Sequence, residues 1–209
     1  GLVETSDVAN GLVTITNGGQ LTMTATGDMD LEGAFLQDGA GAVSTAGDID
    51  TTDDNVTFQS AVTLTGAVDI DTGAGAGAVA FNSTLDGTTA ATETLKITAG
   101  SGNIDFDGVV GDTTELGAVT IKSAADVTAD LAFDAASLRQ EAGTGTTMFS
   151  GALSTTAAAG IEVDGTNFDF NDTVTLTLGD LDVDSSGTVR FNGLVETSDV
   201  ANGLVTITN

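Results

Sequence analysis

Apolar and polar residues alternate along this chain in short stretches, and Gly, Asn, Asp or Ser bounds most of them. The motif G-x-[IV]-x-F-x-[GS]-x-[VL] expresses the alternation most clearly. Its best copies are GAVAFNSTL (77–85), GNIDFDGVV (102–110), GTTMFSGAL (145–153) and GTVRFNGLV (187–195), and weaker copies lie at 54–62 and 164–174. A period of two predicts short β-strands with one apolar side, and the flanking small or polar residues predict bends between them.

The Phe of this motif recurs about once every 21 residues. With Ile in its place in GLVTI, the series is Ile15, Phe35, Phe58, Phe81, Phe106, Phe133, Phe149, Phe170, Phe191 and Ile207. A unit of this length with two or three short strands fits one turn of a β-solenoid. We therefore predict nine turns per long repeat, with these residues stacked as an internal core ladder.

A second, much longer repeat is present. The sequence GLVETSDVANGLVTITN occupies residues 1–17 and recurs without change at 193–209, so one full period is 192 residues. We predict that 1–192 is one long repeat of a tandem array and that 193–209 begins the next identical repeat. The alternative is a duplication at the two ends of one domain.

The two periods together predict an all-β fold, a right-handed parallel β-helix. A β-sandwich suits the length, but sandwiches do not normally contain nine copies of one strand–turn motif. No apolar run approaches the roughly 18 residues of a membrane-spanning helix, so we predict no membrane insertion.

Composition supports strands over helices and removes several kinds of chemistry. The chain has 24 Asp, 7 Glu and 36 Thr, and Asp and Thr are poor residues for helix interiors. It has no Pro, Cys, His, Trp or Tyr. Disulfides, Cys or His zinc sites, a histidine base and a thiol nucleophile are therefore excluded.

The chain is strongly acidic. It has 31 acids against four bases, Lys96, Lys122, Arg139 and Arg190, and a formal net charge of −27. Binding of nucleic acid by phosphate neutralisation is therefore not expected. Without Glu4 and Asp7 of the repeated segment, 25 net negative charges remain per 192 residues. Over roughly 43 Å of rod this approaches the axial charge density of duplex DNA. We predict that stability and lateral association depend on salt or divalent cations.

Three Asp-x-Asp pairs are the candidate metal ligands: Asp28 with Asp30, Asp48 with Asp50, and Asp69 with Asp71. They lie 20 and then 21 residues apart, about one turn each, so they are expected to align on one outer face. Stacked carboxylates repel one another, and Ca²⁺, which prefers oxygen ligands, would relieve that repulsion. In the simpler interpretation each Asp only faces solvent and keeps the rod soluble.

Several stretches resemble a known class of proteins. The GxVxFxGxV strands, GAFLQDGAGAVSTAGDIDTTDDNVTFQSAVTLTG and SLRQEAGTGTTMFSGALSTTAAAGIEV are similar to the β-strand repeats of giant bacterial surface proteins, related in style to filamentous-haemagglutinin-type adhesins. The resemblance implies a long, secreted, rod-like protein involved in attachment or surface coats.

The sequence therefore predicts an extracellular structural fibre or adhesin stalk at the cell surface, without catalysis. Its expected partner is itself, through end-to-end continuation of the β-helix and lateral association. One alternative is a calcium-dependent module that binds a glycan or another cell. The other is a polysaccharide-degrading β-helix enzyme, which would need convergent acids and a nearby base.

Overall fold

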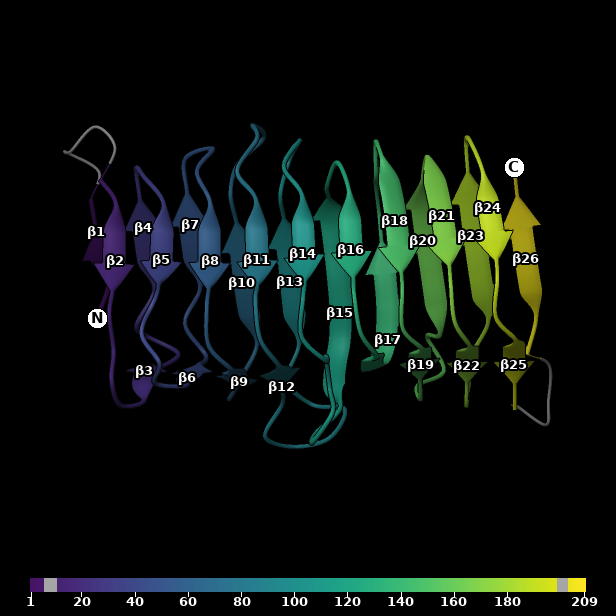
Figure 1. Cartoon of the computed structure of the whole chain (residues 1–209), viewed down its shortest axis with the longest axis horizontal. Helices are drawn as coiled ribbons and strands as arrows, with labels where there is room; N and C mark the ends of the chain where they lie inside the picture. Colours follow the sequence, from purple (N-terminus) through teal and green to yellow (C-terminus); the bar gives the residue numbers. More distant parts are fainter. Residues whose placement is uncertain (6–10, 199–202) are drawn as a thin grey trace.

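A computed structural model of the chain describes residues 1–5, 11–198 and 203–209. Throughout these ranges the regular structure consists of short parallel strands, with no helix, wound into a β-solenoid of about nine turns (Figure 1). Among the described residues there is accordingly no helix long and apolar enough to cross a membrane. The predicted all-β class and solenoid are confirmed.

The coil is right-handed, as predicted. In Figure 1 the chain rises through the fainter strands at the rear, such as β4 (Met29–Leu31), and descends through the strands in front, such as β5 (Phe35–Gln37). Each turn also moves from the N-terminal side at the left towards the C-terminal side at the right. Seen from the N-terminal end, this path turns clockwise as it recedes.

Each turn passes three faces, which we name after their place in Figure 1. The rear face contains β1 (Val3–Glu4), β4, β7 (Ile49–Thr51), β10 (Val68–Asp71), β13 (Leu95–Thr98), β15 (Leu116–Ser123), β17 (Phe133–Gln140), β20 (Ile161–Gly165), β23 (Leu181–Ser185) and β26 (Val205–Thr208). The front face contains β2 (Val13–Ile15), β5, β8 (Val56–Phe58), β11 (Val79–Phe81), β14 (Ile104–Phe106), β16 (Val127–Ala129), β18 (Thr146–Phe149), β21 (Asn167–Phe170) and β24 (Val189–Phe191). The narrow face, at the bottom, contains β3 (Leu21–Met23), β6 (Val43–Thr45), β9 (Val62–Leu64), β12 (Leu85–Asp86), β19 (Leu153–Thr155), β22 (Val174–Leu176) and β25 (Val195–Thr197).

The narrow face continues through a bend in β17. Residues 133–135 of this strand pair with β19 on the narrow face, whereas residues 138–140 pair with β20 on the rear face. Val110 forms bridges to both Leu85 and Phe133 and so connects the two parts of the narrow face. The rear, front and narrow faces therefore each continue along the described part of the coil.

Strands of three residues are long enough to form the core because the side chains of their first and third residues point into it. In β8, Val56 and Phe58 are buried while Thr57 between them is half-buried, and most other strands repeat this pattern. The backbone of each turn bonds to the next, as where Val56 N–H donates to the Ala78 carbonyl at 2.9 Å. Alternation thus gives each turn an apolar inside and a polar outside.

Glycine is required where corners of successive turns stack closely. A Cβ atom at Gly102 would lie 2.1 Å from the carbonyl oxygen of Gly77, the glycine at the corresponding corner one turn earlier. A side chain would therefore collide with backbone that cannot move without breaking the ladder. This contact explains why the strand motif begins with Gly in both turns.

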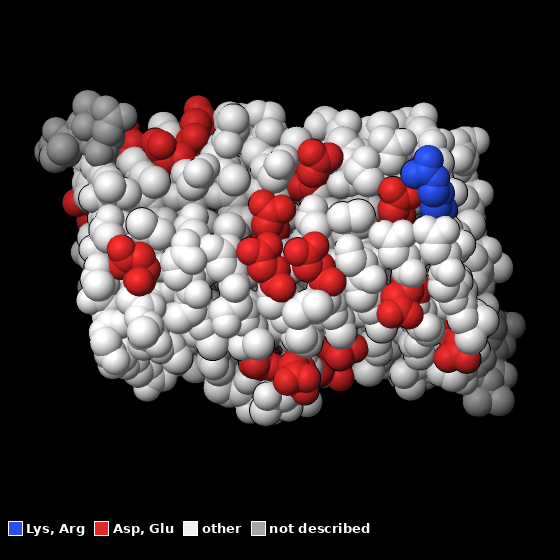
Figure 2. Space-filling view, viewed as in Figure 1, with Lys and Arg blue, Asp and Glu red and all other residues white. Residues whose placement is uncertain are grey.

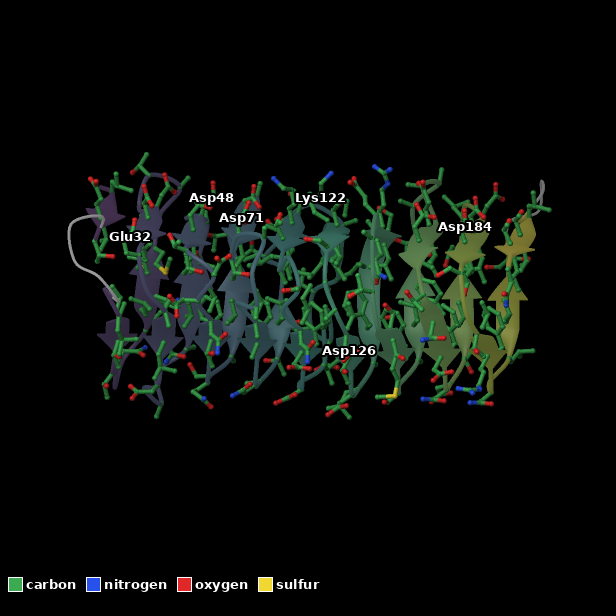
Figure 3. The ribbon with its side chains drawn as sticks, turned by 90° about the horizontal axis from the view of Figure 1, so that it is seen from above. Glu32, Asp48, Asp71, Lys122, Asp126 and Asp184 are labelled. Atoms are coloured by element: carbon green, nitrogen blue, oxygen red, sulfur yellow. The ribbon has the colours of Figure 1, made fainter. Side chains whose placement is uncertain are left out.

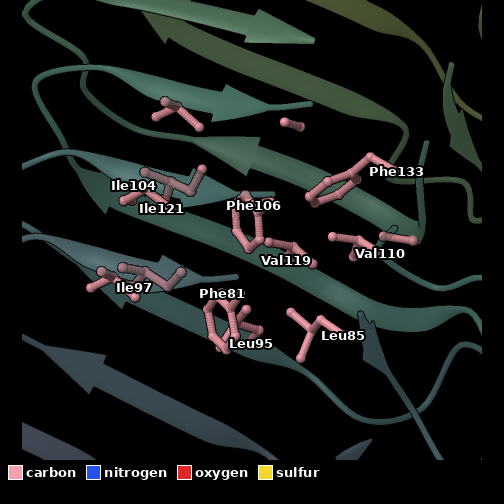
Figure 4. Close-up of a cluster of buried hydrophobic side chains, with 14 of the residues drawn as sticks. Phe81, Leu85, Leu95, Ile97, Ile104, Phe106, Val110, Val119, Ile121 and Phe133 are labelled. Atoms are coloured by element: carbon pink, nitrogen blue, oxygen red, sulfur yellow. The ribbon is translucent and has the colours of Figure 1, made fainter. Parts of the chain in front are cut away.

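Phenylalanine rings form a continuous stack inside the coil. Neighbouring ring centroids lie 4.8–5.8 Å apart along Phe35, Phe58, Phe81, Phe106, Phe133, Phe149, Phe170 and Phe191. Figure 4 shows three of these rings against aliphatic side chains such as Leu95 and Val119, which come from the rear face. The rings fill the space between the front face and the other two faces.

The assignment of Phe35 to the same strand position as Phe58 was wrong by two residues. Phe35 pairs with Val56, and Gln37 is the residue in register with Phe58. Gln37 is 0% exposed, and its amide NH₂ donates to Asn17 Oδ1 at 2.6 Å. It stays in the core because neighbouring polar groups form hydrogen bonds with both the nitrogen and the oxygen of its side-chain amide.

Phe133 is a member of the predicted ring ladder, but it does not occupy the same strand position as Phe106 and Phe149. On the front face Ala129 pairs with both Phe106 and Phe149, and Phe133 belongs to the narrow-face part of β17. Its ring nevertheless packs edge-on against Phe106 and Phe149 at 5.5 and 5.6 Å. A ring from a neighbouring face thus fills the space that the small Ala129 side chain leaves.

The last ladder assignment, Ile207, was wrong as well. Ile15 lies on the front face in register with Gln37, whereas Ile207 lies on β26 of the rear face, pairs with Val183 and is 46% exposed. The predicted boundary between residues 192 and 193 falls between β24 and β25, and the coil continues across it.

Candidate functional site: the charged rear face

Charged side chains gather on the outside of the rear face in two columns. The first column contains Asp28, Asp48, Asp69, Lys96, Thr120, Arg139, Glu162, Asp182 and Thr206. The second contains Glu4, Asp30, Asp50, Asp71, Thr98, Ser123, Glu141, Asp164, Asp184 and Thr208. Strand register places each member above the preceding one, so outward residues of successive turns become neighbours.

All six candidate metal ligands lie on this face and in register. Asp50 pairs with Asp30 on one side and with Asp71 on the other, so three carboxylates stack on consecutive turns. Parallel strands lie about 4.8 Å apart, a distance at which like charges facing one another are unfavourable. In Figure 3 the labelled Asp48 and Asp71 project from the same long side of the rod.

Two of the six carboxylates also hold the backbone of the next turn. Asp28 Oδ1 accepts a hydrogen bond from the Asp48 N–H at 3.1 Å, and Asp48 Oδ1 accepts one from the Asp69 N–H at 2.7 Å. These bonds link successive turns outside the strand ladder. Asp28 and Asp48 therefore have a structural role that does not require a metal.

The stacked carboxylates influence one another's protonation. Burial of its side chain, followed by the negative charges of Asp71, Asp69, Asp30 and Asp48, raises the pKa of Asp50 above its ordinary value of 3.8. Asp69 Oδ1 is buried without a hydrogen-bond partner. In the described ranges, however, no group of three or more acidic side chains is arranged to hold a metal ion. Calcium binding stays a prediction.

Basic residues interrupt the first acidic column at Lys96 and Arg139, and Lys122 lies beside the second column, where the register shifts. Lys96 pairs with Asp69, Lys122 with Glu141, and Arg139 NH1 lies 3.0 Å from Glu141 Oε1. Arg139 also reaches Glu162, with Nε 3.5 Å from Oε2. We call Lys96, Lys122 and Arg139 the basic belt.

The belt changes the protonation of its partners. The hydrogen bond and charge of Asp69 raise the pKa of Lys96. The hydrogen bond from Lys122 lowers the pKa of Glu141, and the charges of Lys122 and Arg139 add to this effect. Three of the four bases of the chain thus neutralise the central turns of an otherwise acidic face.

The sequence spacing of these bases, 26 and 17 residues, does not by itself predict that they lie on neighbouring turns of one face. The unequal spacing has two structural causes. Register shifts after Ile97, so that Thr98 pairs with Ser123 and Lys122 is an extra residue. In β17 the chain turns the corner without leaving the strand, which shortens that turn. Each base of the belt directly follows an inward aliphatic residue, but Arg190 on the front face follows Val189 in the same way, so this local context does not identify the belt.

The front face has a different surface. Its central outward column contains Thr14, Leu36, Thr57, Ala80, Asp105, Thr128, Met148, Asp169 and Arg190. Figure 2, which views this side of the rod, shows acidic groups separated by uncharged areas, with basic side-chain atoms only towards the C-terminal end. Amide side chains also link turns here, as where Asn192 Nδ2 donates to Asn171 Oδ1 at 2.7 Å.

An open depression of about 590 Å³ lies at the corner between the rear and front faces. It is lined by Asp71, Gly73, Ala74, Thr98, Gly100, Ser101 and Ser123. The single acid in this lining, Asp71, accepts the Gly73 N–H at 2.8 Å, and Ser123 Oγ accepts the Gly100 N–H at 3.0 Å. Hydrolysis of a glycosidic bond commonly uses two carboxyl groups, and this depression presents one.

Comparison of the chain with protein-family models, curated proteins and solved structures found no match in any of the three. Functional interpretation therefore depends on the repeat, the coil and the charged rear face.

Proposed function

We propose that this chain is one repeat, with the start of the next, of a long extracellular structural fibre or adhesin stalk. The 17 residues that recur after 192 positions are the observation that carries the proposal. A segment repeated without change within one coil is expected when a unit is copied head to tail. The partner of each repeat is then the neighbouring repeat.

The fold supports a mechanical role. Every turn bonds to the next through backbone hydrogen bonds, and the ring stack runs from Phe35 to Phe191 without a gap. In such a solenoid each turn contacts only its neighbours, so length is added without changing the cross-section. A rod of this type holds two ends at a set distance.

The surface supports exposure to solvent and to ions. A formal charge of −27 keeps rods apart at low ionic strength, and screening by salt allows them to approach. The absence of Cys and the high content of Asp and Thr suit a bacterial surface protein, in line with the resemblance to surface-protein repeats. We therefore assign the fibre to the cell surface.

The direct test is the mass of the denatured polypeptide in its native source, detected with antibodies raised against this chain. A mass several times 20.6 kDa is expected for a tandem array. A mass near 20.6 kDa would overturn the covalent array. In parallel, protease treatment of intact cells should remove the antigen, and full protection would overturn the surface location.

A second candidate function is calcium-dependent adhesion, favoured by the in-register carboxylates of Asp30, Asp50 and Asp71. In this case calcium raises the thermal midpoint more than sodium does at equal ionic strength, and Asp50→Asn reduces that difference. The matched control is Asp38→Asn, directly after β5 of the front face, where the corresponding residues of the adjacent turns are the uncharged Thr16 and Gln59. Equal responses to the two cations in all three proteins would contradict this function.

A further inference from the structure

The two identical segments do not occupy the same part of the coil. In the first copy, β1 pairs with β4 on the rear face and β2 pairs with β5 on the front face. In the second copy, β25 pairs with β22 on the narrow face and β26 pairs with β23 on the rear face. The same sequence is therefore displaced by one face.

The displacement follows from the number of faces that the chain visits. Ten rear-face strands from β1 to β26 span nine turns, and β25, the counterpart of β1, comes one face before β26. One period of 192 residues thus advances the coil by about eight and two-thirds turns. The long repeat and the turn are out of phase by a third of a turn.

Chain connectivity determines both placements. β2 leads through a short corner into β3 on the narrow face, so it must lie on the front face. β25 follows β24 of the front face after residues 192–194, so it must lie on the narrow face. Moving the second copy into phase would require the chain to skip a face.

The same side chains fit either location because the inward neighbours are alike. Val195 lies next to Val174 on the narrow face, and its counterpart Val3 lies next to Met29 on the rear face. Backbone hydrogen bonds between parallel strands do not depend on the side chains. A strand of Val, Thr and Ile can therefore continue any of the three faces.

The two sets of pairings use opposite edges of the segment. The first copy pairs with strands that follow it, and the second copy pairs with strands that precede it. One segment can consequently make both sets at once. We propose that successive repeats join with a rotation of one face, so that the rear face of one repeat is continued by the front face of the next. This inference rests on the tandem array proposed above.

The rotation would limit each charged face to the length of one repeat. Asp182 and Asp184 are followed in register by Thr206 and Thr208 rather than by further acids. In the next repeat, the counterpart of Thr206 is Thr14, which is followed by Leu36. In-phase joining would instead place Glu196 after Asp184 and so continue the second acidic column into the next repeat, while Leu194 would follow Asp182 in the first. Three repeats would return the charged face to its original side.

Cysteine pairs can test the phase in the chain itself, because it contains no native Cys. Outward residues in register on parallel strands lie within the Cα separation that a disulfide requires. The rotated arrangement predicts crosslinks in Thr175→Cys with Glu196→Cys and in Asp182→Cys with Thr206→Cys. An in-phase arrangement predicts them instead for Asp184→Cys with Glu196→Cys and for Arg190→Cys with Thr206→Cys.

Two further pairs complete the design. Asp169→Cys with Arg190→Cys is the reference pair, because these residues lie in register on the front face. Its oxidation rate is the rate expected for two cysteines on adjacent turns. Thr14→Cys with Leu36→Cys tests the first copy, where Thr14 is the counterpart of Thr206. Circular dichroism of each reduced variant verifies that it is folded before oxidation.

We expect the 175–196, 182–206 and 14–36 pairs to oxidise at the rate of the reference pair, within about threefold, while 184–196 and 190–206 remain reduced. Rapid oxidation of either in-phase pair, or none in the rotated pairs, would overturn the rotation. Native mass measurement tests the array separately. A small native mass with the expected crosslinks would contradict only the array.

Discussion

The rear and front faces have the same arrangement of parallel strands but differ in their inward and in their outward side chains. Inside, a column of mainly Ile and Val, such as Ile49, Ile70 and Ile97, backs the rear face, whereas Phe rings back the front face. Outside, the rear face carries most of the ion pairs, and the central column of the front face is largely uncharged. The inward residues hold the coil together, and the outward residues are free to define each face's surface.

The largest effect is expected from breaking the ring stack behind the front face. Phe106 is 1% exposed and lies between Phe81 and Phe133. Phe106→Ala should lower the free energy of unfolding by about 3–5 kcal/mol, because a cavity remains where the ring was. Chemical denaturation measures this effect. Thr57→Ala, on the outside of the same face, should change stability by less than about 0.5 kcal/mol, and equal losses would contradict the comparison.

The next largest effect concerns Gln37, the buried polar residue that lies in register with Phe58 on the inside of the front face. Its Oε1 accepts from the Ser60 N–H and Oγ at 3.2 and 3.1 Å. Gln37→Leu should cost about 1–3 kcal/mol because buried donors and acceptors lose their partner. Hydrogen exchange should increase at the Ser60 amide. Gln59→Leu, which removes an exposed amide, is the control and should cost much less.

A smaller effect is expected from opening the basic belt on the rear face. Arg139 lies near both Glu141 and Glu162, and its side chain is half exposed. Arg139→Gln should lower stability by about 0.5–1 kcal/mol at low salt and by less at high salt, because solvent screens exposed ion pairs. Thermal melts at two ionic strengths measure the difference. A loss that does not depend on salt would indicate packing rather than charge.

The smallest effect should have the opposite sign. Asp50→Asn removes the central charge of three stacked carboxylates and should raise stability at neutral pH by about 0.5 kcal/mol. A thermal melt at low salt provides the measurement. If the substitution destabilises the protein, the carboxylates do not repel one another as their register implies.

The difference in stability between Asp50→Asn and the wild-type protein should depend on pH. Burial and the surrounding acids raise the folded-state pKa of Asp50 above 3.8, so the folded state binds its proton more tightly than the unfolded state. The resulting stabilisation is fully present below pH 3.8 and is lost as the pH rises through the folded-state pKa. The stability of the wild-type protein relative to Asp50→Asn should therefore increase as the pH falls from neutral towards 3.8.

Sequence spacing was informative where turns have nearly equal length. The pairs at Asp28, Asp48 and Asp69 are 20 and 21 residues apart, and they lie in register on the rear face. It failed where corners differ in length or strands bend. Phe133 changes face because β17 turns the corner within one strand, and Lys122 is shifted by an extra residue. A residue count does not distinguish extra corner residues from extra strand residues.

The sequence by itself determined the alternation, the approximate length of a turn and the 192-residue period, because local patterns of apolar and small residues specify strands and bends. Tertiary structure alone decided on which face each strand lies. It therefore assembled the basic belt and displaced identical segments by one face. The physical reason is that a parallel strand accepts any neighbour with a compatible inward side chain, so position in the coil depends on all the corners that precede it.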